Sequence, residues 1–439
     1  MSAQYRLLAA TFAMLPLVAA PAAGAVTPPA IDDALLPPAA PPAATHPTEQ
    51  RGQCFGSSPR DVAESRTPLA LDAVWRLSRG GGQTVAVIDT GVTRHRLLPH
   101  LIGGGDYVSS GDGTSDCDGH GTIVAGIVGG AAADGFSGVA PDVSILAIRQ
   151  SSNKFADASG SSGVGDVDTL AKAVRTAADL GATVINISSV ACVAADDALD
   201  DRALGAALAY AVDVKNVVVV TAAGNVGGPE HCPQQNPAGE PDWDTVVSVA
   251  TPAWYDDLVL CVGSVSRDGT ASTFSLGGPW VDVAAPGEGI VSLHPDGERL
   301  IDTLGKSNPV SGTSYAAPIV SGIAALIRSR FPHLSARDVM RRIEDTAHRP
   351  PGGWNPYLGH GVVDPLAAVS DGGAPTSEPT PVAATSIAQP AVTPDDARSR
   401  RVAFGGAAVC AAATALLAIT LSSRRLRAPT PRSQPVVRD

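Results

Sequence analysis

The sequence has little charge, and the charge it has is of the wrong sign for binding nucleic acid. Only 17% of the 439 residues are Asp, Glu, Lys or Arg, and the formal net charge is −12. Surfaces that bind nucleic acid need clustered Lys and Arg, so nucleic acid is not an expected partner. Residues 422–439 differ from the rest, because they hold five arginines against one aspartate. The two regions are therefore expected to face different environments.

Two segments near the chain ends are almost free of charge. Residues 1–25 combine Arg6, an apolar middle and the small residues AGA at 23–25, a pattern typical of a cleaved secretory signal peptide; the alternative is a disordered Ala-rich tail. Residues 402–421 carry no charge and are long enough to span a bilayer core; the alternative is a buried core helix. Arginines flank this span on both sides, so charge alone leaves the orientation open. A cleaved signal would place the body outside the cell membrane and residues 422–439 in the cytoplasm.

Cysteine is scarce as well, with six residues in the chain. Cys410 lies within the expected membrane span. The other five lie in the part that the signal would export, where disulfides form: Cys54, Cys117, Cys192, Cys232 and Cys261. An odd number leaves one thiol free, and Cys261, inside the apolar run LVLCVGSV, is the expected buried thiol.

Between the two ends, apolar strand-like runs alternate with helical stretches. The runs are at 84–89, 144–149, 183–188, 217–224 and 258–265, and the main helical patterns are at 120–130, 166–182, 200–216, 313–332 and 335–349. Such alternation, with near-continuous Val and Ile runs, predicts an α/β domain over 71–370 with a parallel sheet covered on both faces. Residues 26–70 read as an extended segment and 371–401 as a Pro-rich linker.

Four polar residues are expected at one edge of this sheet. Ligands of parallel α/β sheets bind beyond the carboxyl ends of the strands. Asp89 ends the run VAVID and Asn225 follows the run VVVVTAAG, while His120 and Ser314 each begin a helical stretch. The topology therefore predicts that these four side chains meet.

The motif D-T-G at 89–91 occurs in two protease chemistries. Aspartic proteases need two carboxylates that share a proton, normally from two D-T-G or D-S-G copies. This chain has one D-T-G and no D-S-G, and its pattern is not all-β. A nucleotide-binding α/β protein is disfavoured too, because no Gly-rich phosphate loop follows the first strand. The aspartic and nucleotide-binding alternatives are therefore set aside.

Two further motifs support the serine protease interpretation. DGHGTIVAGIVGG places His120 between glycines, and SGTSYAAPIVSG places Ser314 at the head of an apolar helix. A nucleophilic serine needs a base, and the base needs an orienting acid. Asp89, His120 and Ser314 can fill these roles, and GTSYA does not match the G-x-S-x-G of α/β-hydrolases. Each residue alone has a structural explanation, as a turn acid, a helix-start residue or an N-cap, and Asp118 is read as a turn residue.

Together with GVAPDVSILAIR and the AAGN asparagine, these motifs resemble the subtilase family of serine proteases over residues 71–370. The resemblance implies a subtilisin-like three-layer fold and a catalytic triad of Asp89, His120 and Ser314. It further implies that the Asn225 amide donates to the oxyanion, although an αL turn role is the alternative. No cofactor is expected, and no acidic cluster requires a calcium ion or other metal.

Almost the whole mature chain is similar to a narrower group, the mycosins, which are membrane-anchored subtilases of type VII secretion. The phrases that carry this resemblance are PPAIDDALLPP, PTEQRGQC, AIRQSS, NISSVAC, TPAWYDDLVLCVGSV and FSLGGPWVDVAAPG, with the C-terminal span. The group implies an extracytoplasmic, single-pass endopeptidase of proteins or peptides beside a secretion membrane complex. The alternative role that it implies is a structural subunit with dispensable peptidase activity. NISSVACV replaces the usual SLG of the specificity strand, which leaves substrate preference open.

Neighbourhood and the same resemblance pair Cys54 with Cys117 and Cys192 with Cys232; the alternative is that only one bridge forms. The first bridge would hold the N-terminal segment beside His120. We therefore expect residues 26–68 to brace the domain permanently without gating its activity.

Overall fold

The structure is a computed structural model that describes residues 26–371, apart from 57–68, 70, 134, 158–162, 198, 229–230, 240–241 and 306. By its contacts the chain divides into one unit at 1–376 and another at 377–439. The expected signal peptide, the expected membrane span 402–421 and the tail 422–439 lie outside the described residues. Within the described ranges, no helix is both long and apolar enough to cross a membrane.

A seven-stranded parallel sheet forms the centre of the first unit. Its order is β11-β10-β8-β6-β2-β4-β3, and every neighbouring pair is parallel. The strands are β2 (Thr84–Asp89), β3 (Leu101–Asp106), β4 (Ser144–Arg149), β6 (Val184–Ile187), β8 (Val218–Ala222), β10 (Leu260–Val265) and β11 (Val283–Pro286). The central strands are almost wholly buried because helices cover both of their faces. The expected parallel sheet is confirmed.

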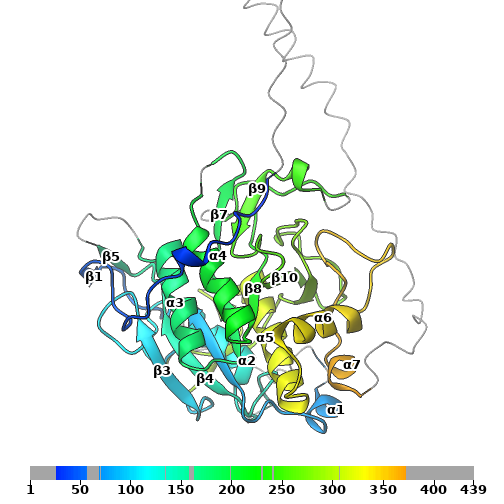
Figure 1. Ribbon diagram of the computed structural model, residues 1–439. Coiled ribbons are helices and arrows are strands. Elements are labelled where there is room, and N and C mark those ends of the chain that lie inside the picture. The colour runs from blue at the N-terminus through cyan, green and yellow to red at the C-terminus, as the bar shows by residue number, and fades with distance from the viewer. Residues whose placement is uncertain are drawn as a thin grey trace, which may run out of the picture. The chain divides into compact units, whose positions relative to one another are not determined.

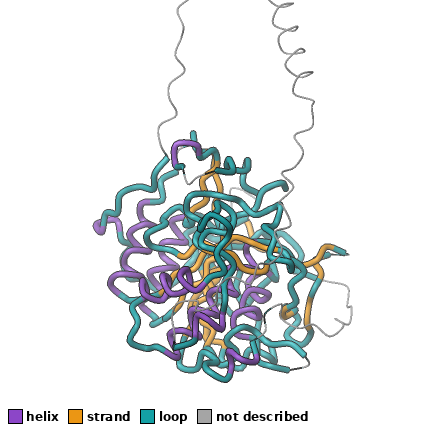
Figure 2. The backbone as a smooth tube through the Cα atoms, turned by 90° about the vertical axis from the view of Figure 1, so that its right-hand side faces the viewer, coloured by secondary structure: helices purple, strands orange, loops and turns teal. Residues whose placement is uncertain are grey.

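Helices form the two outer layers (Figures 1 and 2). On one face lie α3 (Val167–Asp179) and α4 (Arg202–Ala209), which continues as a π-helical turn, η2 (Tyr210–Val214). On the other face, α2 (His120–Gly129) packs beside the long α5 (Thr313–Arg330), and α6 (Ala336–Thr346) packs against α5. Both α2 and α5 are buried along nearly their whole length, which explains why their sequences are apolar on all sides.

Apart from the N-terminal segment and the strand that it pairs with, the remaining elements are short. They are α1 (Asp72–Trp75), α7 (Pro365–Val369), η3 (Trp243–Thr245), and three antiparallel pairs: β7 (Ala191–Ala194) with β9 (Ser248–Thr251), β12 (Ser292–Leu293) with β13 (Leu300–Ile301), and β14 (Thr303–Leu304) with β15 (Asn308–Pro309).

The N-terminal segment is extended, as expected, but it is tied to the domain at several points. A helical turn in its described part, η1 (Asp33–Leu35), packs on α4, and β1 (Thr48–Gln50) pairs with β5 (Phe155–Asp157). Figure 1 shows this segment in dark blue, crossing α4 before it reaches β5. Arg175 on α3 donates a hydrogen bond to the carbonyl of Pro37 at 3.2 Å. The segment therefore forms part of the domain surface.

Candidate active site

Asp89 and His120 meet at the carboxyl edge of the sheet. Asp89 is the last residue of β2 and is fully buried, while His120 is the first residue of α2. His120 Nδ1 donates to Asp89 Oδ1 at 2.7 Å, and the Thr90 amide donates to the same oxygen at 2.8 Å. The His120 side chain is 26% exposed. Because Nδ1 is engaged with the carboxylate, Nε2 is the nitrogen left to face a reacting group.

The charge around His120 raises its pKa above the usual value. Burial alone lowers this pKa, because it disfavours the imidazolium. The hydrogen-bonded carboxylate of Asp89 raises it, with smaller contributions from Asp116 and Asp118, and the net effect is upward. The imidazole is thus set to accept a proton more readily than a free histidine.

A glycine allows α2 to approach β2 so closely. A Cβ on Gly121 would lie 2.1 Å from the Gly91 carbonyl oxygen and 3.1 Å from Asp89 Cβ. Any larger residue at 121 would push the start of α2 away from the end of β2, and the bond between Asp89 and His120 would lengthen.

Asp116 is a buried carboxylate that the sequence reasoning missed. Its Oδ1 accepts from Thr90 Oγ1 (2.8 Å) and the Gly119 amide (2.7 Å), and its Oδ2 accepts from the amide (2.8 Å) and the hydroxyl (2.7 Å) of Thr122. Both hydroxyls also accept an amide hydrogen, from Gly121 and from Thr93 respectively, so their own hydrogens point at Asp116. Asp116 thereby connects the turn after β2 to the first turn of α2.

The protonation state of Asp116 follows from these four donors. Burial raises its pKa to about 6, although each of the four hydrogen bonds lowers it. At neutral pH Asp116 is therefore a carboxylate, and four converging donors leave no space for a proton on it. The motif SDCDGHG has two acids before His120, Asp116 and Asp118, but their spacing alone did not show which of them points into the domain. Asp118 accepts instead from the Ser152 hydroxyl and the Asn153 amide, so its hydrogen bonds in the described chain are with a loop distant in the sequence and not with its own turn.

Ser314 is the second residue of α5, and its carbonyl has an unusual partner. Pro318 lies four residues further along the helix and has no amide hydrogen for this carbonyl. Ser188, just beyond the end of β6, replaces it: the Ser188 hydroxyl donates to the Ser314 oxygen at 2.8 Å. Ser188 Oγ in turn accepts from Asn186 Nδ2 (2.9 Å), and Asn186 Oδ1 accepts from Ser321 on α5 (2.8 Å). This buried chain fixes the start of α5 against β6.

Tyr315 brings the start of α5 to the imidazole. Its ring centroid lies 5.3 Å from that of His120, with the planes tilted by 45°. The residue that follows Ser314 in the chain thus packs directly on His120, and the first turns of α2 and α5 face each other.

Asn225 is held by the same helix end. Its side-chain oxygen accepts from the Thr313 amide at 3.0 Å and from the Thr313 hydroxyl at 3.2 Å. The Asn225 Nδ2 group is therefore the opposite end of the amide, directed away from these two donors of Thr313. Its position beyond β8, three residues after Ala222, is the one expected for a strand-end ligand.

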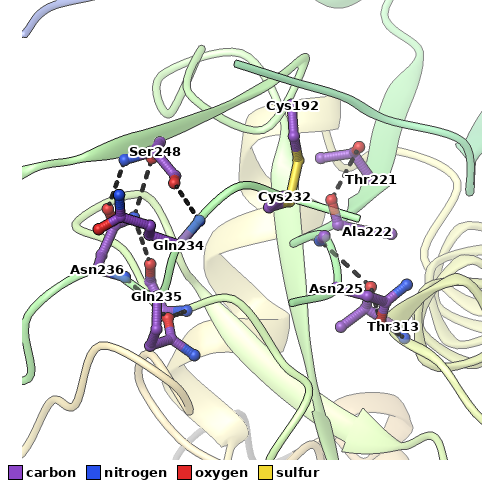
Figure 3. Close-up of a disulfide and its surroundings, with 12 residues drawn as sticks. Cys192, Thr221, Ala222, Asn225, Cys232, Gln234, Gln235, Asn236, Ser248 and Thr313 are labelled. Carbon is purple, nitrogen blue, oxygen red and sulfur yellow. Dashed lines mark hydrogen bonds between the residues drawn. A yellow bond between two sulfur atoms is a disulfide. The ribbon is translucent and has the colours of Figure 1, made fainter. Parts of the chain in front are cut away.

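A disulfide packs behind Asn225. Cys192 on β7 is bonded to Cys232, and Figure 3 shows this bridge close to Asn225 and Thr313. A Cβ on Gly224 would lie 2.8 Å from Cys232 Sγ, and Gly224 has a φ of +104°. Both observations require glycine beside Asn225.

The N-terminal segment reaches the other side of the site. Cys54 is bonded to Cys117, and the Phe55 amide donates to the Cys117 carbonyl at 2.7 Å. The Phe55 ring packs on Gly119, next to His120. The structure thus contains both disulfides that the resemblance implies, and Cys261 is a buried free thiol as expected. Among the described residues, no group of three or more His, Cys, Asp or Glu side chains is arranged to hold a metal ion.

Comparisons with known proteins agree with this geometry. The profile of the subtilase family (Peptidase S8) matches residues 80–361. Mycosin-4 of Mycobacterium tuberculosis is 56% identical, with 96% of each chain covered.

Solved structures match as well. The structure of the MycP3 protease from the type VII (ESX-3) secretion system has a TM-score of 0.73 and 44% identity, and the match covers 79% of this chain and 100% of that one. A chain from the structure of an intact ESX-5 inner membrane complex also has a TM-score of 0.73, with 39% identity, and the match covers 90% of this chain and 100% of that one.

Proposed function

The chain belongs to the subtilase family, in its mycosin group, and from this premise we propose that Asp89, His120 and Ser314 form the catalytic triad of an exported, membrane-anchored serine endopeptidase. The observation that carries the proposal is the 2.7 Å hydrogen bond from His120 to the buried Asp89, beside the helix start that presents Ser314.

In the proposed reaction, Ser314 Oγ attacks the scissile carbonyl carbon while His120 Nε2 takes the hydroxyl proton. Asp89 keeps Nδ1 protonated and stabilises the imidazolium. The carbonyl electrons move onto oxygen, where Asn225 Nδ2 donates a hydrogen bond, with the start of α5 nearby. Collapse of this intermediate breaks the C–N bond, and the proton on Nε2 goes to the leaving amine. A water molecule, deprotonated by His120, then attacks the acyl carbon. The bond from this carbon to Ser314 Oγ breaks as His120 returns the proton to Oγ.

The first experiment measures labelling of the purified full-length chain by a fluorophosphonate probe. We expect labelling of the wild type and none of Ser314→Ala, with His120→Ala reduced by several orders of magnitude. Equal labelling of wild type and Ser314→Ala would refute the nucleophile assignment. A folded wild type that resists labelling would refute an accessible, assembled site.

The remaining parts of the proposal concern location. We assign 1–25 to a signal peptide, 26–70 to an extended segment, 71–370 to the peptidase domain, 371–401 to a linker, 402–421 to a single membrane span and 422–439 to a cytoplasmic tail. Resistance of the chain to carbonate extraction from membranes, and its loss on deletion of 402–439, tests the anchor.

A second function, a structural role in a type VII secretion membrane complex, has its own support. Similar chains occur in the structures titled as the periplasmic assembly and the intact form of the ESX-5 inner membrane complex. Its test is complex assembly in cells that carry only Ser314→Ala. Normal assembly would show that the folded domain supports the complex without peptidase activity. Failed assembly would show that the structural role requires catalysis.

A further inference from the structure

A wide hollow of the described surface lies away from the candidate active site. It has a volume of about 1010 Å³ and lies between the N-terminal segment, the α4–η2 helix, Trp243 and the loop 255–258. None of its lining residues is Asp89, His120, Asn225 or Ser314. We name it the α4 groove. Its volume suits a peptide segment or a large ligand.

The α4 groove has an apolar surface that nothing in the described chain covers. Ile31 from the N-terminal segment is 42% exposed, and Val214 at the end of η2 is 68% exposed. Leu36, Ala206 and Leu258 add further apolar lining. Large aliphatic side chains gathered in one concave surface are typical of a binding site.

The charged residues of the groove are acidic. Four aspartates line it, against one basic residue, Arg337. Arg337 is already used: it binds both carboxylate oxygens of Asp213, at 2.8 and 3.1 Å, and the backbone oxygen of Asp257 at 2.7 Å. Asp33 and Asp256 form no ion pair among the described residues, whereas the carboxylate of Asp257 interacts electrostatically with Arg337. The groove thus carries an excess of negative charge, four carboxylates against one guanidinium, around an apolar floor.

The N-terminal segment builds one wall of the groove and cannot easily leave it. The Val26 amide donates to the Trp243 carbonyl at 3.3 Å, and η1 packs on α4. The Cys54–Cys117 bridge fixes the segment covalently farther along. The hollow is therefore a lasting feature of the folded chain.

From this chemistry we propose that the α4 groove binds an extended segment of a partner protein in which Lys or Arg alternates with aliphatic residues. The aliphatic side chains contact Ile31 and Val214, and the cations pair with Asp256, Asp257 and Asp33. An anionic ligand, such as nucleic acid or a phosphate-bearing headgroup, is disfavoured by the same charges. The proposal does not depend on catalysis, so it stands or falls separately from the triad.

The test selects peptides from a random dodecapeptide library displayed on phage. The target is the full-length Ser314→Ala chain in detergent, which prevents cleavage of the peptides. The winning peptides are then synthesised, and their Kd values are measured by fluorescence polarisation at low and high salt. We expect peptides rich in Lys or Arg and in Leu, Ile or Val, whose binding weakens with salt.

Matched variants locate the binding site. Replacing Asp256 and Asp257 together by Asn should raise Kd about tenfold or more, and Val214→Ser about fivefold, because charged and apolar contacts are each worth on the order of 1 kcal/mol. The controls are another exposed acidic pair, Asp196 and Asp197 replaced by Asn, and Leu180→Ser, an exposed leucine outside the groove. Both controls should bind as the parent does.

Three results would overturn the proposal: no enriched peptide, enriched peptides without net positive charge, or cationic peptides that bind the groove variants as tightly as the controls. Fluorophosphonate labelling of the same groove substitutions in the Ser314 background should match the wild type, which separates failure of the groove from failure of the catalytic proposal.

Discussion

At the scale of residues, the site depends on polar groups that hold the reacting ones in place. Asp89 and His120 could be found from sequence, because a strand-ending acid and a glycine-flanked histidine leave a recognisable pattern. Asp116 and Ser188 could not, because their roles depend on where side chains point. Four donors surround Asp116 only once the strands and helices are assembled. The same is true of the Ser188 hydroxyl, which donates to the Ser314 carbonyl because Pro318 has no amide hydrogen.

Asp116→Asn should slow the site and shift its pH dependence. The general base works as neutral imidazole, so the rate of fluorophosphonate labelling should fall as the pH drops through the raised pKa of His120. Removing the Asp116 charge lowers the pKa of His120, so this acid limb should move to lower pH. The plateau rate should fall about tenfold. The asparagine keeps one accepting oxygen, but its NH2 group would face hydrogen-bond donors that it cannot accept from.

The control for this prediction is Asp112→Asn. Asp112 bonds to Thr114 in the same segment but is exposed, and it does not contact the helix start. Its labelling profile should match the wild type. An unshifted acid limb in Asp116→Asn would contradict the proposed electrostatic contribution.

Ser188→Ala should lower stability by about 1–3 kcal/mol, because it leaves the Ser314 carbonyl without a donor. The double variant Ser188→Ala with Pro318→Ala restores an amide hydrogen four residues along the helix. Its free energy of unfolding should therefore be higher than the sum of the two single changes predicts. Urea unfolding of all four chains measures this coupling, and strict additivity would contradict it.

At the scale of elements, the sequence predicted those with a strong local pattern. The five apolar runs correspond to β2, β4, β6, β8 and β10, and the five helical patterns to α2–α6. Two strands of the seven-stranded sheet were missed. The segment of β3, LIGGGD, contains three glycines that hide its strand character, and β11, VAAP, is short and ends in proline. Both segments are strands because they form hydrogen bonds with a neighbouring strand. The local sequence pattern carries no information about that neighbour.

The Cys54–Cys117 bridge should contribute about 4 kcal/mol to stability, because it closes a loop across 63 residues. Replacing both cysteines by serine should lower the melting temperature accordingly. Cys410→Ser, which removes a thiol from the expected membrane span, should leave it unchanged. Equal melting of the double variant and the wild type would mean that β1, η1 and their contacts hold the segment unaided.

At the scale of the whole molecule, the N-terminal segment is a structural part of the catalytic unit. It pairs with β5, packs on α4 and, through Phe55, contacts the start of the helix that presents His120. Its extended character was predictable from its prolines. Its route over the domain was not, since that route is fixed by contacts with residues distant in the sequence, such as the bridge across 63 residues to Cys117 and the pairing of β1 with β5.

Deleting residues 26–50 should therefore destabilise the domain without activating it. We expect a lower melting temperature and a fluorophosphonate labelling rate, at a temperature where the variant is folded, within about twofold of the wild type. A rate increase of tenfold or more would show instead that the segment restrains the peptidase.

The bridge between Cys54 and Cys117 also determines how backbone cleavage would appear in the laboratory. A protease that cuts the chain anywhere between these two cysteines leaves both fragments in one covalent species. The mass on a non-reducing gel would stay that of the uncut chain, and two bands would separate only after a thiol is added. For this protein, cleavage of the backbone and release of the N-terminal fragment are therefore separate chemical events. Release requires an electron donor that reduces the disulfide.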